Sequence, residues 1–340
     1  MKIIVVGRLF PDSFAKNISI TLEKMGHIVV NYEENKPFTK LLPDNTLGSH
    51  KLLRYIENSL IRFSSKFEQK IYKSLIKIAI QNKPDLILVT YNNIPPKVIK
   101  IIKDLIKVKI VLWFPDSLSN LGRQYILQSE YDAFFFKDQF VAKKFREVLD
   151  LNSFYLPEAF NPIWHKKIEL SKKDIKKYGC DLTIASNMYP YRAKLLDQFA
   201  NYNFKIWGDK FPTWLITPLK KCYQGESVAE LSKSKAFNSA KIVLNTLHYS
   251  EIEGVNCRFF EIIGCGGFQI VDWNPALNDL AIPDEEVVTF KTKSELKEKV
   301  DYFLNHPKER KIIADKAYQR AQKEHTYEKR LDKLIKITFS

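Results

Sequence analysis

Two glutamates in the last third of the chain, Glu253 and Glu261, lie eight residues apart across a glycine and a short apolar segment. Gly254 and Val255 follow the first glutamate, and Asn256 then offers a side chain that commonly caps a helix start. We expect a strand to end before this loop and a short helix to begin at Asn256. The free backbone N–H groups of these three residues, with the positive helix end, would form an anion site.

Two side chains of the expected helix extend this site. Arg258 falls in the first turn, where a planar guanidinium suits phosphate. Glu261 lies farther along and offers two acceptor oxygens, which match the 2′- and 3′-hydroxyls of a ribose. A diphosphate at one end and a ribose at the other predict a nucleotide diphosphate as ligand. The alternative is a surface helix with two unrelated carboxylates, because this spacing alone has low specificity.

Other motifs that carry chemistry are absent from the sequence. It has no GxxxxGK[ST], GxGxxG, GxSxG or HExxH pattern, which disfavours nucleotide hydrolases, dinucleotide oxidoreductases and zinc proteases. The six histidines lack metal-ligand spacing, and no D-x-D motif points to a metal. Four scattered cysteines without a CxxC pair predict reduced, mostly buried thiols.

The elements that must position these residues alternate between short apolar strands and amphipathic helices. Strands are expected at 2–7, 27–31, 85–90, 109–114 and 132–136, and the pattern restarts at 181–186, 204–208, 241–245, 267–272 and 286–290. This alternation is typical of parallel sheets covered by helices, whose ligands bind beyond the carboxyl ends of the strands. We predict an α/β fold of two Rossmann-like, doubly wound parallel-sheet domains that face a cleft.

Three regions follow from this pattern. A proline-containing loop and a lysine-rich stretch separate the two strand series between residues 160 and 177. We therefore expect a first domain at 1–168 and a second, nucleotide-binding domain at 169–325. A last helix at 326–340 is a candidate to cross back to the first domain.

The charge of the 340-residue chain is strongly positive, with 54 Lys and Arg against 39 Asp and Glu. Residues 51–109 hold 13 basic and 4 acidic side chains. Lys66, Lys70, Lys73 and Lys77 lie at helical spacing, with an apolar stripe that should pack inward. They form either a solvated face or a surface for anionic lipid. No specific nucleic-acid partner is expected, because no nucleic-acid-binding motif accompanies the charge.

The start of the chain reads directly into an apolar strand, and no apolar run approaches the roughly 20 residues of a membrane-spanning helix. We therefore expect a cytoplasmic protein. If the basic face binds anionic lipid, the protein would lie peripherally at the inner face of the membrane.

The segment around Glu253 resembles the donor-site motif of GT-B-fold glycosyltransferases, especially family 4 and the CgeB-like group. The shared residues are Glu253-Gly254-Val255, Phe259-Phe260-Glu261 and Cys265-Gly266. The CgeB-like variant Val-Asn-x-Arg-x-Phe-Glu is matched by Val255, Asn256, Arg258, Phe260 and Glu261. The tail of the chain matches as well, with a His306-Pro307 pair and the closing residues 324–327. The resemblance is specific over residues 235–334 and weaker at 181–225.

This resemblance implies transfer of a sugar from a nucleotide-diphosphate sugar to a hydroxyl acceptor on a glycan, glycolipid or protein. It implies no cofactor and no metal. Glu261 would hold the donor ribose, and Glu253 would lie by the sugar or the diphosphate. The backbone N–H groups of Gly254, Val255 and Asn256 would contact donor phosphate or sugar.

The weaker part of the resemblance supplies Asn187 and Arg192. Arg192, with Arg258, would neutralise the diphosphate leaving group in place of a metal. Family 4 proteins often carry a lysine five positions after this arginine, but Asp197 stands there in this chain. The sequence therefore does not identify the second cationic residue of the site.

The first domain is expected to bind the acceptor. Asp116 follows a strand in the sequence WFPDS and would serve as general base or as a ligand of the acceptor hydroxyl. A helix-capping aspartate is the alternative. Arg8 and Asp12, in the loop after the first strand, are candidate acceptor contacts. A lipid-linked acceptor would bring the basic face to a membrane.

Three other functions compete with sugar transfer. They are a nucleotide-sugar epimerase, a non-catalytic GT-B scaffold or binding protein, and a nucleic-acid-modifying transferase suggested by the charge.

Overall fold

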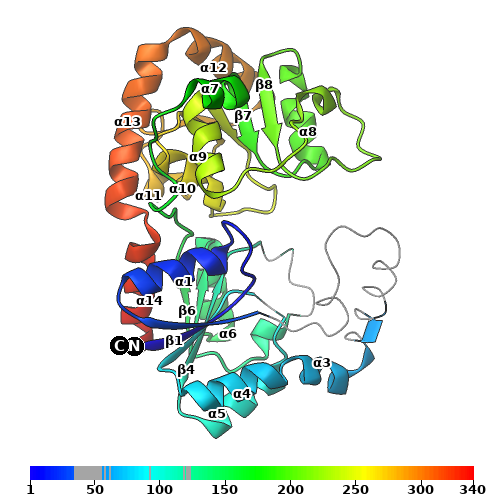
Figure 1. Ribbon diagram of the computed structural model, residues 1–340, viewed down its shortest axis with the longest axis vertical. Helices are drawn as coiled ribbons and strands as arrows, with labels where there is room; N and C mark the ends of the chain where they lie inside the picture. The colour runs from blue at the N-terminus through cyan, green and yellow to red at the C-terminus, as the bar shows by residue number, and fades with distance from the viewer. Residues whose placement is uncertain (34–55, 57–58, 61–62, 92, 118, 120–123) are drawn as a thin grey trace. The chain divides into compact units, whose positions relative to one another are not determined.

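The computed structural model of the chain describes residues 1–33, 56, 59–60, 63–91, 93–117, 119 and 124–340 (Figure 1). These divide into two compact units. Unit 1 comprises Met1–Phe136, Ala142–Tyr155 and Leu334–Ser340, and unit 2 comprises Lys137–Val141 and Leu156–Lys333. The predicted boundaries were at residues 168 and 325, whereas the units change over after Tyr155 and after Lys333.

The described part of unit 1 is built on a parallel sheet of six strands in the order β2-β1-β3-β4-β5-β6. The strand sequences are almost entirely apolar, as expected for strands covered on both faces. The strands are β1 (Lys2–Val6), β2 (Ile28–Tyr32), β3 (Leu86–Val89), β4 (Lys109–Phe114), β5 (Ala133–Phe136) and β6 (Ser153–Tyr155).

Helices connect these strands, because parallel neighbours need a crossover. They are α1 (Phe14–Lys24), α3 (Ser65–Ile71), α4 (Lys73–Asn82), α5 (Pro96–Leu105) and α6 (Gln139–Leu149). Ser13 caps α1 by accepting a hydrogen bond from the Lys16 N–H at 3.3 Å.

The described part of unit 2 contains a parallel sheet of five strands in the order β11-β10-β9-β7-β8. They are β7 (Cys180–Ala185), β8 (Phe204–Trp207), β9 (Ala240–Asn245), β10 (Gln269–Asp272) and β11 (Val288–Phe290). Its helices are α7 (Lys172–Tyr178), α8 (Pro190–Leu196), α9 (Glu230–Ser239), α10 (Cys257–Gly264), α11 (Leu277–Leu280), α12 (Lys293–Asn305), α13 (Pro307–Glu324) and α14 (Tyr327–Phe339), which ends in unit 1.

The predicted fold class is confirmed, because both units are parallel sheets with helical crossovers. In each sheet the strand that comes first in the chain has the second strand on one side and the third strand on its other side. The direction in which the sheet grows reverses there, and this place is a topological switch point. That point lies between β1 and β3 in unit 1 and between β7 and β9 in unit 2. Ligands of such folds bind at the carboxyl ends of the strands at this point.

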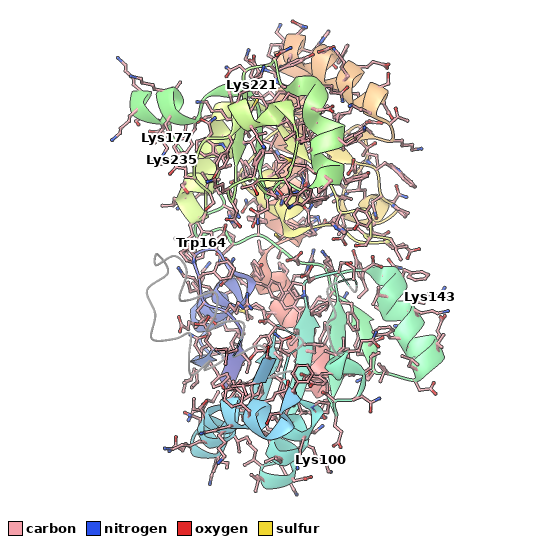
Figure 2. All side chains as sticks on the ribbon, turned by 90° about the vertical axis from the view of Figure 1, so that its right-hand side faces the viewer. Lys100, Lys143, Trp164, Lys177, Lys221 and Lys235 are labelled. Carbon is pink, nitrogen blue, oxygen red and sulfur yellow. The ribbon has the colours of Figure 1, made fainter. Side chains whose placement is uncertain are left out.

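The predicted apolar stripe at residues 66–83 is confirmed where the structure describes it. Ile71, Tyr72 and Leu75 are buried, whereas Lys73 and Lys77 are exposed. Residues 51–55, 57–58, 61–62 and 92 of the basic stretch lie outside the described residues. Figure 2 shows two labelled lysines of unit 1, Lys100 and Lys143, at the edge of the drawn molecule.

Among the described residues, no helix combines the length and the apolarity that are needed to cross a bilayer. The four cysteines are unpaired, and Cys180, Cys222 and Cys265 are buried, as predicted.

Candidate donor site and acceptor cavity

The switch point of unit 2 is bridged by one arginine, Arg258 of α10. Its Nε donates to the Ala185 carbonyl oxygen at the end of β7, at 2.6 Å. Its other nitrogens donate to Ser186 Oγ at 2.8 Å and to Asn245 Oδ1, at the end of β9, at 3.1 Å. The predicted anion-binding residue therefore lies where this type of sheet binds its ligands.

Arg192 of α8 contributes a second guanidinium to the same edge. It is 5% exposed and donates to the carbonyl oxygens of Asn187 and Thr246 and to the Thr246 hydroxyl. Burial, followed by the positive charge of Arg258, lowers the pKa of Arg192 to about 9. Two mutually repelling cations at a sheet edge favour an anionic ligand.

The cation that accompanies Arg192 is thus Arg258, which comes from a different helix. Asp197, at the position where family 4 proteins often have a lysine, instead forms an ion pair with Lys293 at 2.5 Å. The spacing between Arg192 and position 197 therefore does not identify the second cation of the site.

Asn187 follows β7 as predicted, but its amide is engaged by a neighbouring turn. Its Nδ2 donates to Asp209 Oδ2 and its Oδ1 accepts from the Asp209 N–H, both at 2.9 Å. Trp207, which precedes this turn, is a core residue whose Nε1 donates to the Thr183 hydroxyl.

The predicted helix start at Asn256 is confirmed. Its side chain accepts from the Phe259 N–H at 3.1 Å, and its Nδ2 donates to Asn245 Oδ1 at 3.0 Å. The Val255 side chain is fully buried in the core, so only its backbone can face a ligand. The helix ends at Gly264, and Gly266 follows in the left-handed region at φ 74°.

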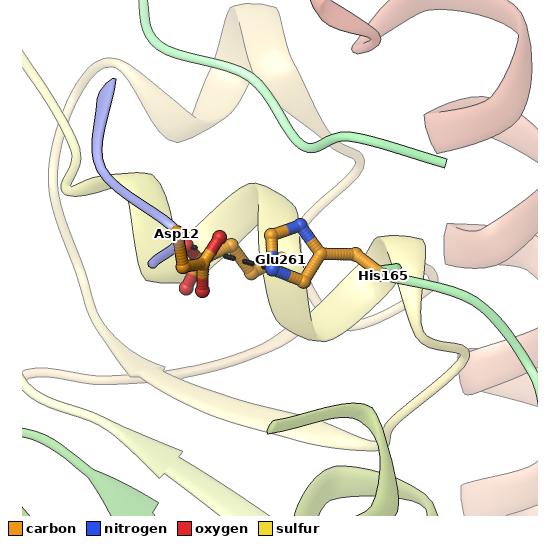
Figure 3. Close-up of side chains that lie close together, drawn as sticks. All are labelled: Asp12, His165 and Glu261. Atoms are coloured by element: carbon orange, nitrogen blue, oxygen red, sulfur yellow. Dashed lines mark ion pairs between the residues drawn. The ribbon is translucent and has the colours of Figure 1, made fainter. Parts of the chain in front are cut away.

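Glu261 lies on α10, and its carboxylate is partnered within the protein. Lys233 Nζ donates to its Oε1 at 2.9 Å, and both side chains are largely buried. The His165 ring approaches the same oxygen, with Nε2 at 3.9 Å (Figure 3). A ribose at Glu261 would share the carboxylate with Lys233. Lys233 and His165 come from distant segments, and no sequence pattern identified them.

Glu253 differs from Glu261 in that its carboxylate has no partner among the described residues. Its side chain is half-buried, whereas its backbone N–H and carbonyl are both hydrogen-bonded. This is the state expected of a carboxylate that serves a ligand.

One carboxyl group at the same edge was missed by the sequence analysis. Asp272 ends β10 and accepts from the Leu247 N–H at 2.8 Å. Burial raises its pKa to about 7, against the opposing effects of this hydrogen bond and of the Arg192 charge. Asp272 is the last residue of an apolar strand, and this position in the sequence could have identified it as a residue of the ligand-binding edge.

Unit 1 has a cavity of about 350 Å³ at the carboxyl ends of β1, β3 and β4. Arg8, Thr90, Tyr91 and Asp116 line it, so it lies at the switch point of this sheet. The Asp116 carboxylate accepts from the Ser117 N–H at 2.8 Å. The structure brings together two of the predicted acceptor residues, Arg8 and Asp116. The third, Asp12, is not part of the lining and contacts Asn17.

Known proteins resemble both the sequence and the fold. Residues 192–336 match a family model described as glycosyl transferase-like. Spore protein CgeB of Bacillus subtilis (strain 168) is 25% identical over 223 residues, which cover 61% of this chain and 68% of CgeB.

Solved structures align over nearly the whole chain. Sucrose-phosphate synthase from Thermosynechococcus elongatus has a TM-score of 0.70 at 12% identity, with 99% of both chains covered. A glycosyltransferase from Rickettsia africae has a TM-score of 0.68 at 12% identity, with 99% and 97% covered. Anabaena HepE in complex with UDP-glucose has a TM-score of 0.66 at 13% identity, with 99% of both chains covered. These similarities show the GT-B fold.

The fold and the partial family match agree with the motif around Glu253: the chain has the GT-B fold, and its residues 192–336 match a glycosyl transferase-like family model.

Proposed function

We propose that the protein transfers a sugar from a nucleotide-diphosphate sugar, bound at the carboxyl edge of the unit 2 sheet, to a hydroxyl acceptor. The observation that carries this proposal is the arrangement at the switch point. Two arginines and a helix start gather where β7 and β9 end, and Glu253, whose carboxylate has no partner among the described residues, lies on the loop that leads into this helix. The Anabaena protein HepE, which shares the fold, has been solved with UDP-glucose, and this supports the choice of donor class.

The arginines have capacity left for a diphosphate. A guanidinium carries five N–H bonds, and each of these two arginines donates three hydrogen bonds to the protein. Arg258 is the more accessible, so we assign it the direct contact with the diphosphate. Arg192 is buried and would act mainly through its charge. Both would stabilise the charge that develops on the leaving group.

The other donor residues keep their predicted roles in this proposal. Glu261 would accept from the ribose hydroxyls, and Glu253 would lie by the sugar. The backbone N–H groups of Gly254, Val255 and Asn256 would contact the phosphates or the sugar. The Asn187 side-chain amide is bound to Asp209, so Asn187 would lie at the edge of the donor site without a direct side-chain contact to the donor.

The acceptor would bind in the unit 1 cavity, with Asp116 as the general base that removes the hydroxyl proton. Arg8 in the same lining favours an acceptor with an anionic group nearby. A glycan, a glycolipid or a protein hydroxyl fits this description. If the acceptor is lipid-linked, the exposed Lys73 and Lys77 would contact anionic headgroups. Co-sedimentation with liposomes at low and high salt measures this binding.

We expect turnover to be independent of divalent cations, because Arg192, Arg258 and the start of α10 supply positive charge at the leaving diphosphate. Turnover in EDTA should stay within about twofold of the untreated rate. Loss of turnover on chelation that Mn²⁺ or Mg²⁺ restores would refute this part of the mechanism.

Replacement of Glu261 by Gln should weaken donor binding by roughly tenfold to hundredfold. The physical reason is the loss of a charged hydrogen bond to ribose, typically about 1.5–3 kcal/mol. Gln is preferable to Ala, because its amide oxygen still accepts a hydrogen bond from the largely buried Lys233, although the charge of the pair is lost. Calorimetric titration of the folded variant with the donor measures the effect. An unchanged dissociation constant would remove Glu261 from the donor site.

A thermal-shift screen tests the proposed donor class. UDP-, GDP-, dTDP-, ADP- and CMP-sugars are offered to the intact chain. A ligand at 100 times its dissociation constant stabilises the folded state by about 2.7 kcal/mol. We expect at least one nucleoside-diphosphate sugar to raise the melting temperature. Absence of any shift would favour a scaffold that binds a partner without catalysis.

A further inference from the structure

The segment Lys137–Val141 follows β5 directly in the sequence, yet it packs as part of unit 2. There Asp138 forms an antiparallel bridge with Gly254, and the Gln139 N–H donates to the Glu253 carbonyl oxygen at 2.9 Å. A Cβ at Gly254 would lie 2.9 Å from the Lys137 carbonyl oxygen and 3.1 Å from the Asp138 Cα. The glycine after Glu253 is therefore required by this close approach of two backbones.

The Asp138 carboxylate holds the backbone that carries Glu253. Its Oδ2 accepts from the Ile252 N–H at 3.0 Å and from the Glu253 N–H at 3.1 Å. Its Oδ1 accepts from the Val141 N–H at 3.3 Å, in the first turn of α6. Asp138 is 8% exposed, so these bonds are shielded from competing water.

A buried ion pair fastens the start of the same loop. Lys137 Nζ lies 2.6 Å from Glu251 Oε1, and the two side chains are 6% and 5% exposed. Burial lowers the pKa of Lys137, but the charges of Glu158 and Glu251 outweigh it, and the net pKa is raised. Lys137 therefore stays protonated, and removing one partner would leave a buried charge uncompensated.

Asn274 holds the loop from another element, because its Nδ2 donates to the carbonyl oxygens of Glu251 at 3.3 Å and Ile252 at 3.2 Å. The backbone of residues 251–254 is thus fixed by several contacts, while the Glu253 carboxylate has no partner among the described residues. A fixed backbone under an unengaged carboxylate is the arrangement of a preorganised site.

We propose that Lys137 and Asp138 are positioning residues that hold the loop 251–254 so that Glu253 is aligned with the donor sugar. This proposal rests on the role given to Glu253 under the proposed function. Neither residue touches the reacting atoms in this account, and both act through Glu253. The sequence alone did not single them out, because they lie more than 110 residues before the loop.

The test combines Asp138→Asn with a matched control. Asn keeps the size of the side chain but replaces one acceptor oxygen by a donor group. Glu286→Gln is the control, because the Glu286 carboxylate also accepts from a loop N–H, that of Ile282 at 2.8 Å, and pairs with Arg320 at 2.7 Å. A second variant, Lys137→Met with Glu251→Gln and Glu158→Gln, removes the ion pair together with the other buried carboxylate whose charge acts on Lys137.

The kinetic readout is release of nucleoside diphosphate from UDP-glucose, or from the donor found by the thermal-shift screen. Asp138→Asn should lower kcat by about 10- to 100-fold with KM within threefold, since misplacement by about 1 Å has effects of this size. In a Glu253→Gln background the same change should cost less than about twofold. Glu286→Gln should leave kcat unchanged. A fall in kcat of equal size in both backgrounds would overturn the proposal.

Hydrogen exchange gives a second readout that needs no turnover. The amides of Ile252 and Glu253 should exchange at least about tenfold faster in Asp138→Asn and at the native rate in Glu286→Gln. Unchanged protection in Asp138→Asn would also overturn the proposal. Failure of the proposed function is recognised separately, because the unmodified chain would then bind and turn over no nucleotide sugar.

Discussion

Replacement of Glu253 by Gln is expected to lower kcat by about 100- to 1,000-fold, with the dissociation constant for the donor changed less than threefold. A carboxylate beside the sugar stabilises positive charge that develops only in the transition state, so its loss affects kcat more than binding. Steady-state kinetics and calorimetric titration of the same preparation separate the two effects.

The fold should tolerate this substitution. The Glu253 carboxylate has no partner among the described residues, and the hydrogen bonds of its backbone remain in the variant. We expect a melting temperature within about 1 °C of the native protein, because surface changes of this kind usually alter stability by less than 0.5 kcal/mol. A folded Glu253→Gln variant with native kcat would exclude Glu253 from the reaction.

Asp116→Asn should lower kcat by about 100- to 10,000-fold if Asp116 is the general base, the range typical of such groups. Donor affinity should stay unchanged, because the donor residues lie in unit 2. The acidic limb of the pH–rate profile should also disappear, since it reports protonation of the base.

A suitable control is Asp132→Asn. Asp132 accepts from the Ile110 N–H at 2.7 Å near the amino end of β4 and does not line the unit 1 cavity that contains Asp116. This variant should keep native turnover. If Asp116→Asn retains both kcat and the acidic limb, Asp116 is an acceptor-binding or structural residue.

Most of the fold could be predicted from the sequence, because its strands are short apolar runs with clear ends. The predicted range 109–114 for β4 matches the structure at both ends, and α10 begins directly after the predicted cap, Asn256. The missed elements include β6, α7 and the four-residue helix α11. β6 has only three residues, Ser153–Tyr155, and α7 has the lysine-rich sequence KKDIKKY, which resembles a linker.

The physical reason for α7 is its cap. Ser171 and Asp174 form a reciprocal capping box that satisfies the first N–H groups of the helix. Tyr178 then buries its ring against the core. A polar composition concealed a helix that local hydrogen bonds start and one aromatic side chain anchors.

The candidate site could be predicted only where its residues are close in sequence. Gly254, Asn256, Arg258 and Glu261 fall within one loop and one helix, so the order of residues identified them. Their partners are non-local. Lys233 and His165 reach Glu261 from other segments, and Asp138 reaches Glu253 from 115 positions away. Such pairs depend on strand order, which sequence periodicity does not specify.

The structure also changes how two predicted residues are understood. Arg192 is nearly fully buried and bound to the protein, so its charge matters more than direct contact. Gly254 is explained by close packing on Lys137 and Asp138, in addition to any contact of its N–H with a donor. Both residues keep a place in the proposed site for reasons that the motif alone does not show.

The most direct test of the central claim is the stoichiometry of sugar transfer. The intact chain is incubated with the donor found by the screen and a set of hydroxyl acceptors, and mass spectrometry follows both products. The account predicts one nucleoside diphosphate released for each sugar added to an acceptor, with both lost in Glu253→Gln. No acceptor gaining a sugar, or binding of a nucleotide sugar without release of the diphosphate, would contradict it.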